Sequence, residues 1–247
     1  MLEENYCYNI RMCYSEEYGL YRVAGLLFVA RDCGSVFFER AEKYRAEGGD
    51  PEFEISITED DLRFFDEKEF TEEGFRYFVS GLKFYFELIK RGGLMLHSSA
   101  VVKDGKAYLF SGPSGIGKST HTGYWLKLFP DAYVLNDDKP AVIRTERGFT
   151  AYGTPWSGKY DISRNEGVPI GGVAFIERAD EDRIERADTV SAFAGVMSQT
   201  VRHIRRERME ELLSTVEALI GEVPVYRLYC TNSVSAARLA SETMCTL

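Results

Sequence analysis

Two apolar stretches joined by Asp104-Gly105, the second of which runs straight into a glycine-rich loop, constrain this chain more than any other feature. Residues 94–102 and 106–110 have the composition of paired strands, and an Asp-Gly pair between such stretches is a strong signal for a two-residue hairpin turn. In that hairpin Lys103 pairs with Lys106. Counting outward from this pair, we expect His97 to lie opposite Gly112, the first residue of the loop.

The loop itself matches the phosphate-binding pattern G-x-x-x-x-G-K-[ST], and it has the strand before it and the helix after it that the pattern requires. Its glycines allow backbone N–H groups to face inward around a phosphate. Lys118 is expected to reach the β- and γ-phosphates, and the Ser119 hydroxyl is expected to bind magnesium with support from Thr120. The predicted nucleotide-binding residues are Gly112, Pro113, Ser114, Gly115, Ile116, Gly117, Lys118, Ser119 and Thr120.

A pair of carboxylates follows the next predicted strand. Residues 132–135 are apolar, and Asn136-Asp137-Asp138 comes directly after them. One carboxylate can hold a metal ion while its neighbour accepts a proton from an attacking hydroxyl. The alternative is an ordinary turn, but the position one helix and one strand after the phosphate loop favours a site.

The stretch 96–120, together with 134–142, resembles the catalytic domain of HPr kinase/phosphorylase, a family that shares its fold with phosphoenolpyruvate carboxykinase. The resemblance covers residues 94–180 well and the last third of the chain loosely, and it looks closest to small HPr-kinase-like proteins of bacteria. It implies an α/β fold with a mixed sheet, a P-loop kinase domain of the HPr kinase/PEP carboxykinase type, and ATP and magnesium as cofactors.

The resemblance also implies roles for individual residues. His97 stands at the family's active-site histidine, Asp137 at its acid–base aspartate and Asp138 at a magnesium-binding position, although the roles of the two aspartates are interchangeable. Lys118 and Ser119 match the phosphate lysine and the magnesium hydroxyl.

Residues 153–155, Gly-Thr-Pro, are similar to a stretch of that kinase domain, but the chain then continues differently. Lys159 is expected either to neutralise phosphate charge or to be an exposed loop lysine. Trp156 is either a lid or a packing residue, and Arg164 is a weaker candidate for a phosphate clamp. The family's signature for binding HPr and magnesium is not clearly present after this stretch.

The chain divides most naturally at Gly92-Gly93, which gives an N-terminal β-rich region with a helix (1–93) and a catalytic domain (94–247). The family's regulatory domain is not recognisable in the first region. The pattern predicts strands at 5–14, 20–30, 35–40, 52–57, 132–135, 140–145, 169–177 and 223–229. It predicts helices at 71–91, 118–129, 189–200, 205–220 and from residue 233 onward.

Charge and composition exclude some classes of protein. A net charge of −9 argues against nucleic acid as a partner. Residues 39–73 carry a net charge equal to that of the whole chain and form either a solvated face or a docking surface for a basic partner. The basic segment 202–208 is likewise a solvated face or a dock. The longest apolar run, 20–30, is too short to span a membrane.

The five cysteines form no C-x-x-C pair, and the first residues show no signal peptide, so we expect free thiols and a cytoplasmic location. The leading hypothesis is a kinase that phosphorylates a hydroxyl on a peptide, protein or small metabolite. The alternatives are a nucleotide-binding interaction module without catalysis and, with less support, a PEP carboxykinase-like enzyme. The sequence leaves the acceptor and the presence of a homo-oligomer open.

Overall fold

The chain folds into a three-stranded sheet near its N-terminus and a nine-stranded mixed sheet, in a computed structural model that describes residues 18–200 and 206–246. The small sheet has the order β1 (Tyr18–Val23), β2 (Leu26–Arg31), β3 (Phe53–Ser56). Strands β1 and β2 are antiparallel, and β2 and β3 are parallel. The strand predicted at 5–14 lies outside the described residues.

Two predictions for the N-terminal region were wrong. The single strand expected at 20–30 is broken by a turn at Ala24-Gly25, where both φ angles are positive. The residues expected as a strand at 35–40 form helix α1 (Ser35–Ala41). The Glu73 carboxylate accepts hydrogen bonds from the backbone N–H and the hydroxyl of Ser35 at the start of this helix. Because Glu73 is 38 residues away, the local pattern could not indicate this cap.

The strands of the large sheet follow an order that mixes parallel and antiparallel neighbours, which confirms the α/β class. In spatial order they are β4 (Gly93–Met95), β8 (Ala141–Thr145), β9 (Gly148–Tyr152), β10 (Gly167–Arg178), β6 (Lys106–Ser111), β5 (Ser98–Lys103) and β7 (Tyr133–Asn136). Strand β12 (Val225–Cys230) also pairs with β10, and β11 (Arg183–Arg186) pairs with β12. Strands β9 and β11 were not predicted, and the strand expected at 94–102 is split at Leu96-His97.

The helices agree with the predicted positions to within a few residues. They are α3 (Glu72–Ile89), α4 (Lys118–Leu128), α5 (Thr189–Ser198), α6 (Arg206–Glu222) and α7 (Val234–Met244), with the short α2 (Glu59–Leu62) and the 3-10 turn Glu42–Tyr44 in addition. Of the basic segment 202–208, the part up to residue 205 lies outside the described residues. Arg206 and Arg208 in α6 form ion pairs with Glu210 and Glu211.

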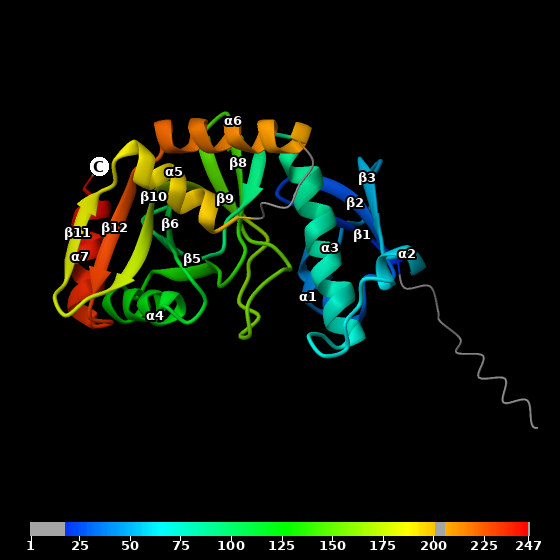
Figure 1. Cartoon of the computed structure of the whole chain (residues 1–247), viewed down its shortest axis with the longest axis horizontal. Helices are drawn as coiled ribbons and strands as arrows, with labels where there is room; N and C mark the ends of the chain where they lie inside the picture. The colour runs from blue at the N-terminus through cyan, green and yellow to red at the C-terminus, as the bar shows by residue number, and fades with distance from the viewer. Residues whose placement is uncertain (1–17, 201–205, 247) are drawn as a thin grey trace, which may run out of the picture.

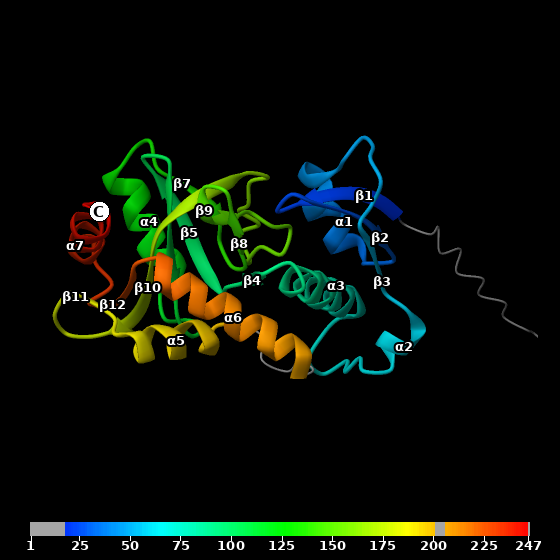
Figure 2. The same cartoon turned by 90° about the horizontal axis from the view of Figure 1, so that it is seen from above.

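The two faces of the large sheet are covered by different helices, and successive side chains of the central strands pack against one set of helices or the other. Tyr108 and Phe110 of β6 belong to an apolar cluster with α4 and α7, whereas Ala107 and Leu109 belong to a cluster that includes α5 and α6. Figures 1 and 2 show α4 and α7 together on one side of the sheet and α5 and α6 on the other. Because successive side chains of a strand point to opposite faces of the sheet, both faces are apolar and both are covered by helices. The result is a three-layer arrangement of helices, sheet and helices.

Strand directions bring five separate segments to one edge of the large sheet. Strands β6, β10 and β12 are parallel, so their carboxyl ends meet at this edge. Strand β5 is antiparallel to β6 and β7 is antiparallel to β5. The start of β5 and the end of β7 consequently lie at the same edge, where the candidate site is found.

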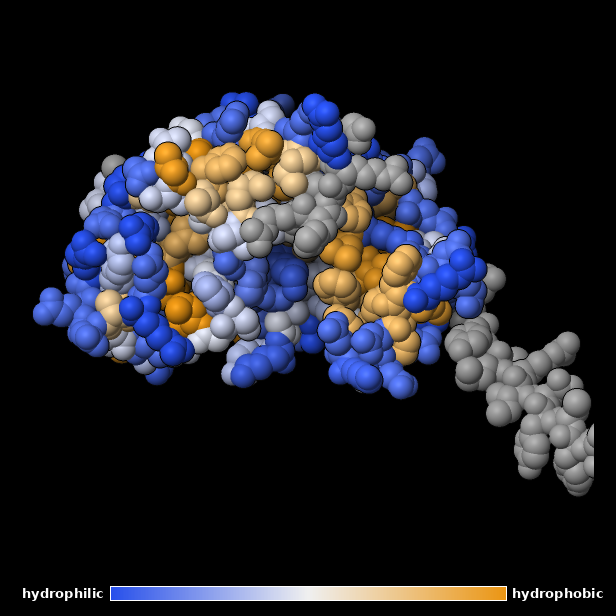
Figure 3. All heavy atoms as spheres, viewed as in Figure 1, coloured by the Kyte–Doolittle hydropathy of each residue, from blue (hydrophilic) through white to orange (hydrophobic). Residues whose placement is uncertain are grey.

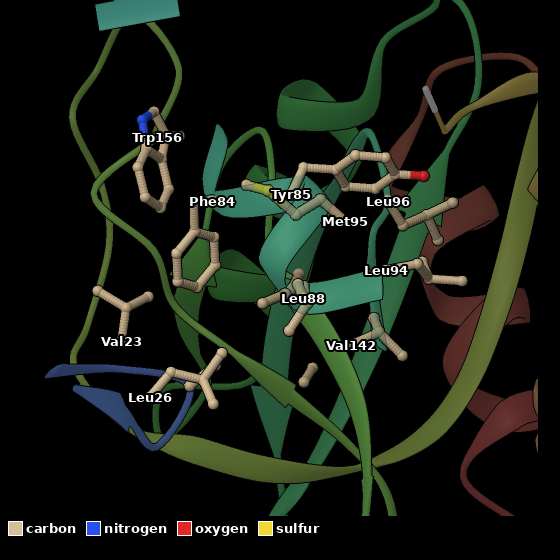
Figure 4. Packing of buried hydrophobic residues seen from close by; sticks show 14 of the residues in the cluster. Val23, Leu26, Phe84, Tyr85, Leu88, Leu94, Met95, Leu96, Val142 and Trp156 are labelled. Atoms are coloured by element: carbon tan, nitrogen blue, oxygen red, sulfur yellow. The ribbon is translucent and has the colours of Figure 1, made fainter. Parts of the chain in front are cut away.

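Trp156 connects the N-terminal region to the large sheet. The side chain is 2% exposed, its ring centroid lies 4.7 Å from that of Phe84 and 5.8 Å from that of Phe37, and its Nε1 donates a hydrogen bond to Ser80 Oγ at 3.0 Å. Figure 4 shows Trp156 and Phe84 in the same cluster as Val23 of β1. Of the two roles considered for Trp156, the structure shows the packing role.

Three of the cysteines, Cys33, Cys230 and Cys245, are free thiols, while Cys7 and Cys13 lie outside the described residues. Burial raises the pKa of Cys33 to about 12. Within residues 18–200 and 206–246, no helix combines the length and apolar character needed to cross a lipid bilayer.

We expect Trp156→Ala to lower the free energy of unfolding by about 3–5 kcal/mol, because it leaves a large cavity where α1 and α3 meet the loop after β9. Denaturant titration followed by circular dichroism measures this loss. Val190→Ala, at a side chain that is 77% exposed, is the control and is expected to change stability by less than about 0.5 kcal/mol. Equal stability of the two variants would contradict the packing role.

Candidate active site

The hairpin that carries the phosphate loop has the predicted register. Lys103 pairs with Lys106 across Asp104-Gly105, and the last pair at the other end is Ser98 with Ser111. The Ser111 hydroxyl donates a hydrogen bond to the His97 carbonyl at 2.8 Å. The ladder ends one step before the predicted pair of His97 with Gly112, and this hydrogen bond keeps the His97 backbone next to the strand that enters the loop.

The loop backbone needs its glycines. Gly112, Gly115 and Gly117 have φ angles of 145°, 77° and 118°, a region in which other residues are strained. A Cβ atom at Gly112 would also lie 3.3 Å from the carbonyl oxygen of Ile176. No side chain caps the start of α4, so the first N–H groups of that helix are available to an anion.

Lys118 is folded back onto the loop that precedes it. Its ammonium group donates hydrogen bonds to the carbonyl oxygens of Gly112 (2.9 Å) and Pro113 (3.2 Å), and the residue is 8% exposed. Burial lowers the pKa of Lys118, although the negative charge of Asp138 opposes this shift. The group is thus held against the backbone at the start of the loop.

Asn136 arranges the backbone that presents the two aspartates. Its Nδ2 donates to the Thr154 carbonyl at 3.0 Å, and its Oδ1 accepts from the N–H groups of Asp138 and Lys139. Asn136 is fully buried. Losing this amide would leave several buried polar groups without partners, so it fixes the turn that carries the acid pair.

Asp137 and Asp138 are in different electrostatic environments. Burial raises the pKa of Asp137, and the neighbouring charge of Asp138 adds to this, although the Gly158 N–H donates to Asp137 Oδ1 at 2.6 Å. Burial also acts on Asp138, but hydrogen bonding to His97 and the charge of Lys139 outweigh it and lower the pKa to about 2. Asp138 Oδ1 lies 3.2 Å from His97 Nε2, and Oδ2 lies 2.8 Å from Lys139 Nζ.

Asp137 and Ser119 line one cleft. The cleft has a volume of about 350 Å³, and Thr120 and Ser99 contribute to its polar wall. The apolar residues that line it include Tyr160, Ile162, Leu126 and Val134. The structure thus brings one aspartate to the hydroxyl predicted to bind magnesium, while the other aspartate forms a cluster with His97 and Lys139.

The remaining sequence candidates lie further from this centre. Lys159 is exposed, and its ammonium lies 4.7 Å from the ring centroid of Tyr160 at the rim of the cleft. The Arg164 guanidinium stacks on Tyr133 at 4.0 Å. Trp156 packs in the core, as described above.

Sequence reasoning missed two residues next to the loop. Arg178, at the end of β10, donates from Nη2 to the Gly115 carbonyl at 2.7 Å. Asn232, after β12, has a positive φ of 60°, and its Oδ1 lies 3.5 Å from the position of a Cβ at Gly117. Both follow strands that run parallel to β6, so only the strand order could have indicated them.

The residues present fit a magnesium ion that is shared with a nucleotide. In the described part of the chain, no group of three or more His, Cys, Asp and Glu side chains is arranged to hold a metal. Magnesium, however, is usually held by one or two carboxylates together with substrate phosphates and water. The Ser119 hydroxyl and the Asp137 carboxylate, on the walls of one cleft, are a donor set of this kind.

His121, near the start of α4, is buried, and its Nδ1 has no hydrogen-bond partner within the part of the chain that the structure describes. Its Nε2 accepts a hydrogen bond from Trp125 Nε1 at 3.3 Å, and its ring lies 4.4 Å from that of Phe110. Burial lowers the pKa of His121 to about 4, although the negative charge of Asp182 opposes this shift. His121 is therefore neutral at physiological pH.

Comparisons with known proteins give one family match. A family model described as SynChlorMet cassette protein ScmC matches residues 75–235. No curated protein matches the chain. Among solved structures, the Hpr(Ser) kinase/phosphatase from Coxiella burnetii is similar over 51% of this chain and 89% of that chain, with 12% identity and a TM-score of 0.26. A likeness at that level says nothing about activity.

We expect the stability of the protein to fall as the pH is lowered from 6.5 toward 4. Unfolded His121 takes up a proton near pH 6.5, whereas the folded protein does so only near pH 4. The unfolded state therefore binds more protons in this window and gains about 3 kcal/mol relative to the folded state. Denaturant titrations across this range measure the effect.

His121→Gln is the matched variant, since glutamine keeps a hydrogen-bond acceptor and does not titrate. The difference between wild type and this variant isolates the contribution of His121 from that of other groups. Parallel stability profiles for the two proteins would show that His121 is not buried in its neutral form.

Proposed function

This chain belongs to the SynChlorMet cassette protein ScmC family, and we propose that it is an ATP- and magnesium-dependent kinase that transfers the γ-phosphoryl group to a hydroxyl. The acceptor is a peptide, a protein or a small metabolite. One observation carries the proposal: the glycine loop with Lys118 and Ser119 meets the Asp137-Asp138 pair at one edge of a mixed sheet. The resemblance of residues 96–120 and 134–142 to the HPr kinase/phosphorylase catalytic domain supports the same class of reaction.

At the nucleotide end, the loop N–H groups and the uncapped start of α4 bind the β-phosphate. Lys118 exchanges its bonds to the loop carbonyls for bonds to phosphate oxygens, because an ionised acceptor forms a stronger hydrogen bond than a neutral one. Arg178, which donates to Gly115, adds positive charge on the outside of the loop. Lys159, whose ammonium lies next to the Tyr160 ring of the cleft wall, remains our candidate for neutralising the charge of the phosphates or of the leaving ADP.

Of the two arrangements that the sequence leaves open for the aspartates, we favour the one in which Asp137 and Ser119 bind magnesium. They line the same cleft, whereas both oxygens of Asp138 already contact cationic side chains. When bound, magnesium supplies charge neutralisation for the β- and γ-phosphates.

In this arrangement the Asp138–His97 pair acts on the acceptor. A hydrogen bond from His97 Nε2 to Asp138 leaves Nδ1 free to take the proton of the acceptor hydroxyl. The hydroxyl oxygen then forms its bond to the γ-phosphorus as the bond to the ADP oxygen breaks. Asp138 holds the ring and stabilises its protonated form.

Incubation of the protein with γ-labelled ATP, magnesium and a cell extract should label an acceptor. We expect Lys118→Met and His97→Gln to reduce labelling by about 10²–10⁴-fold, in line with the loss of a phosphate contact or a general base. Wild-type labelling in both variants would contradict the proposed site. If all proteins, including wild type, neither label an acceptor nor release phosphate, the chain is a nucleotide-binding interaction module.

Substitutions of the two aspartates should distinguish the metal ligand from the acid–base group. We expect Asp137→Asn to weaken magnesium-dependent ATP binding, and Asp138→Asn to keep that binding but lose transfer. Asp131→Asn, at an exposed carboxylate, is the control and should change neither. The reverse result for the pair would assign Asp137 as the acid–base group and Asp138 as the metal ligand.

ATP binding should depend strongly on magnesium. ATP brings about four negative charges, and Lys118 with the loop dipoles does not balance them next to two carboxylates. Calorimetric titration with ATP should therefore show weak binding in EDTA that recovers when magnesium is added. Tight binding without any divalent ion would contradict the site.

A further inference from the structure

A second cavity lies beside the His97–Asp138–Lys139 cluster, outside the cleft of Ser119 and Asp137. It has a volume of about 460 Å³ and lies between helix α3 and the segments around residues 95–97 and 198–200. Its apolar wall is formed mainly by Phe70, Tyr77, Phe78, Tyr85, Met95 and Trp156. His97 and Lys139 also line it, so the cavity adjoins the group proposed to act on the acceptor.

One face of α3 makes the hollow. Gly74, Phe78, Gly81 and Tyr85 recur at spacings of three or four residues, which places them on one side of the helix. Both glycines line the cavity. At Gly81 a Cβ would lie 2.9 Å from Trp156 Cδ1, so the indole packs directly on this glycine and forms the neighbouring part of the wall. Phe78 is 41% exposed, and Figure 3 shows apolar residues exposed in this part of the molecule.

The polar atoms of this wall are already paired within the protein. Tyr85 Oη is bonded to Thr200 Oγ1, Tyr77 Oη to the carbonyl oxygens of Pro155 and Ser157, and Trp156 Nε1 to Ser80 Oγ. The wall therefore presents ring faces and hydrocarbon to an occupant. A bulky apolar group fits it better than a sugar or a charged group.

Charge distinguishes the outer end of the cavity from the inner end. Near Phe70, where the chain enters α3, Asp66, Glu67 and Glu69 are exposed, and one exposed lysine, Lys68, lies among them, so this segment keeps a net negative charge. The inner end carries Lys139 and His97. An occupant that runs from one end to the other meets the catalytic cluster, then an apolar surface, then negative charge.

We propose that this cavity binds the acceptor and that the acceptor is a peptide segment. This proposal rests on the proposed kinase function. The hydroxyl of the peptide lies at His97, a bulky apolar side chain enters the cavity beside Gly74 and Phe78, and a basic side chain reaches Glu67 and Glu69. Residues 74–85 of α3 span about 16 Å at 1.5 Å per residue. An extended peptide covers this length with about five residues, and the test peptides therefore carry the basic residue five positions from the serine.

The test uses fluorescein-labelled nonapeptides with one serine, either tryptophan or alanine two residues from it, and either lysine or glutamate five residues from it. We expect wild type with ATP analogue and magnesium to bind the tryptophan–lysine peptide at least 10-fold more tightly than the alanine–lysine or tryptophan–glutamate peptide. Fluorescence anisotropy measures binding without requiring transfer.

Variants of the cavity should act on the peptide and not on the nucleotide. Phe78→Glu and the cavity-filling Gly74→Leu should each weaken binding of the tryptophan–lysine peptide at least 10-fold. Charge reversal by Glu67→Lys with Glu69→Lys should exchange the preference between lysine and glutamate peptides. Val190→Glu, at an exposed apolar residue on α5, is the control. ATP affinity should stay within about twofold of wild type in every variant.

The outcomes separate the two proposals. If wild type binds no peptide of the set, or if Phe78→Glu, Gly74→Leu and Val190→Glu bind alike, the peptide subsite is wrong even where transfer to another acceptor is found. If the peptide binds as expected but no condition transfers phosphate to its serine, the subsite stands and the kinase function fails.

Discussion

The antiparallel pairing of β5 with β6 is the constraint on which the candidate site depends. The two-residue turn at Asp104-Gly105 leaves one register for this pair. That register pairs Ser98 with Ser111, and the Ser111 hydroxyl then holds the His97 carbonyl next to the strand that enters the loop. Strand β7 then pairs with the other side of β5 and delivers Asp137 and Asp138 to the same edge. A slip of one residue would move every side chain of β5 to the opposite face, and the histidine and the aspartates would separate.

Strand β10 extends this edge to the rest of the molecule. Its first residues pair antiparallel with β9, and its later ones pair in parallel with both β6 and β12. The antiparallel part positions the loop that carries Gly158, whose N–H bonds to Asp137. The parallel part ends at Arg178, which bonds to the phosphate loop. One continuous strand therefore supports both sides of the candidate site.

The structural features that could be predicted from the sequence are those determined by contacts between residues close together in the chain. The hairpin and the glycine loop are specified within a few residues of one another, and both were predicted with the observed register. Helix α1 was mistaken for a strand because its cap, Glu73, comes from another helix. The break at His97 was missed because its N–H bonds to the Gln199 carbonyl, far along the chain, instead of continuing the strand. Arg178 and Asn232 required the order of parallel strands, which periodicity does not contain.

The resting position of Lys118 has a consequence for ligand choice. Its ammonium already donates hydrogen bonds to two neutral carbonyl oxygens. A ligand therefore gains binding free energy from Lys118 only if its own acceptor atoms form stronger hydrogen bonds than these two oxygens. A nucleoside, which has no phosphate, has nothing to offer at that position, and a terminal phosphate next to the ammonium offers the most. For the proposed kinase, we therefore expect the loop to discriminate by the charge density of what enters it, ahead of any recognition of the base.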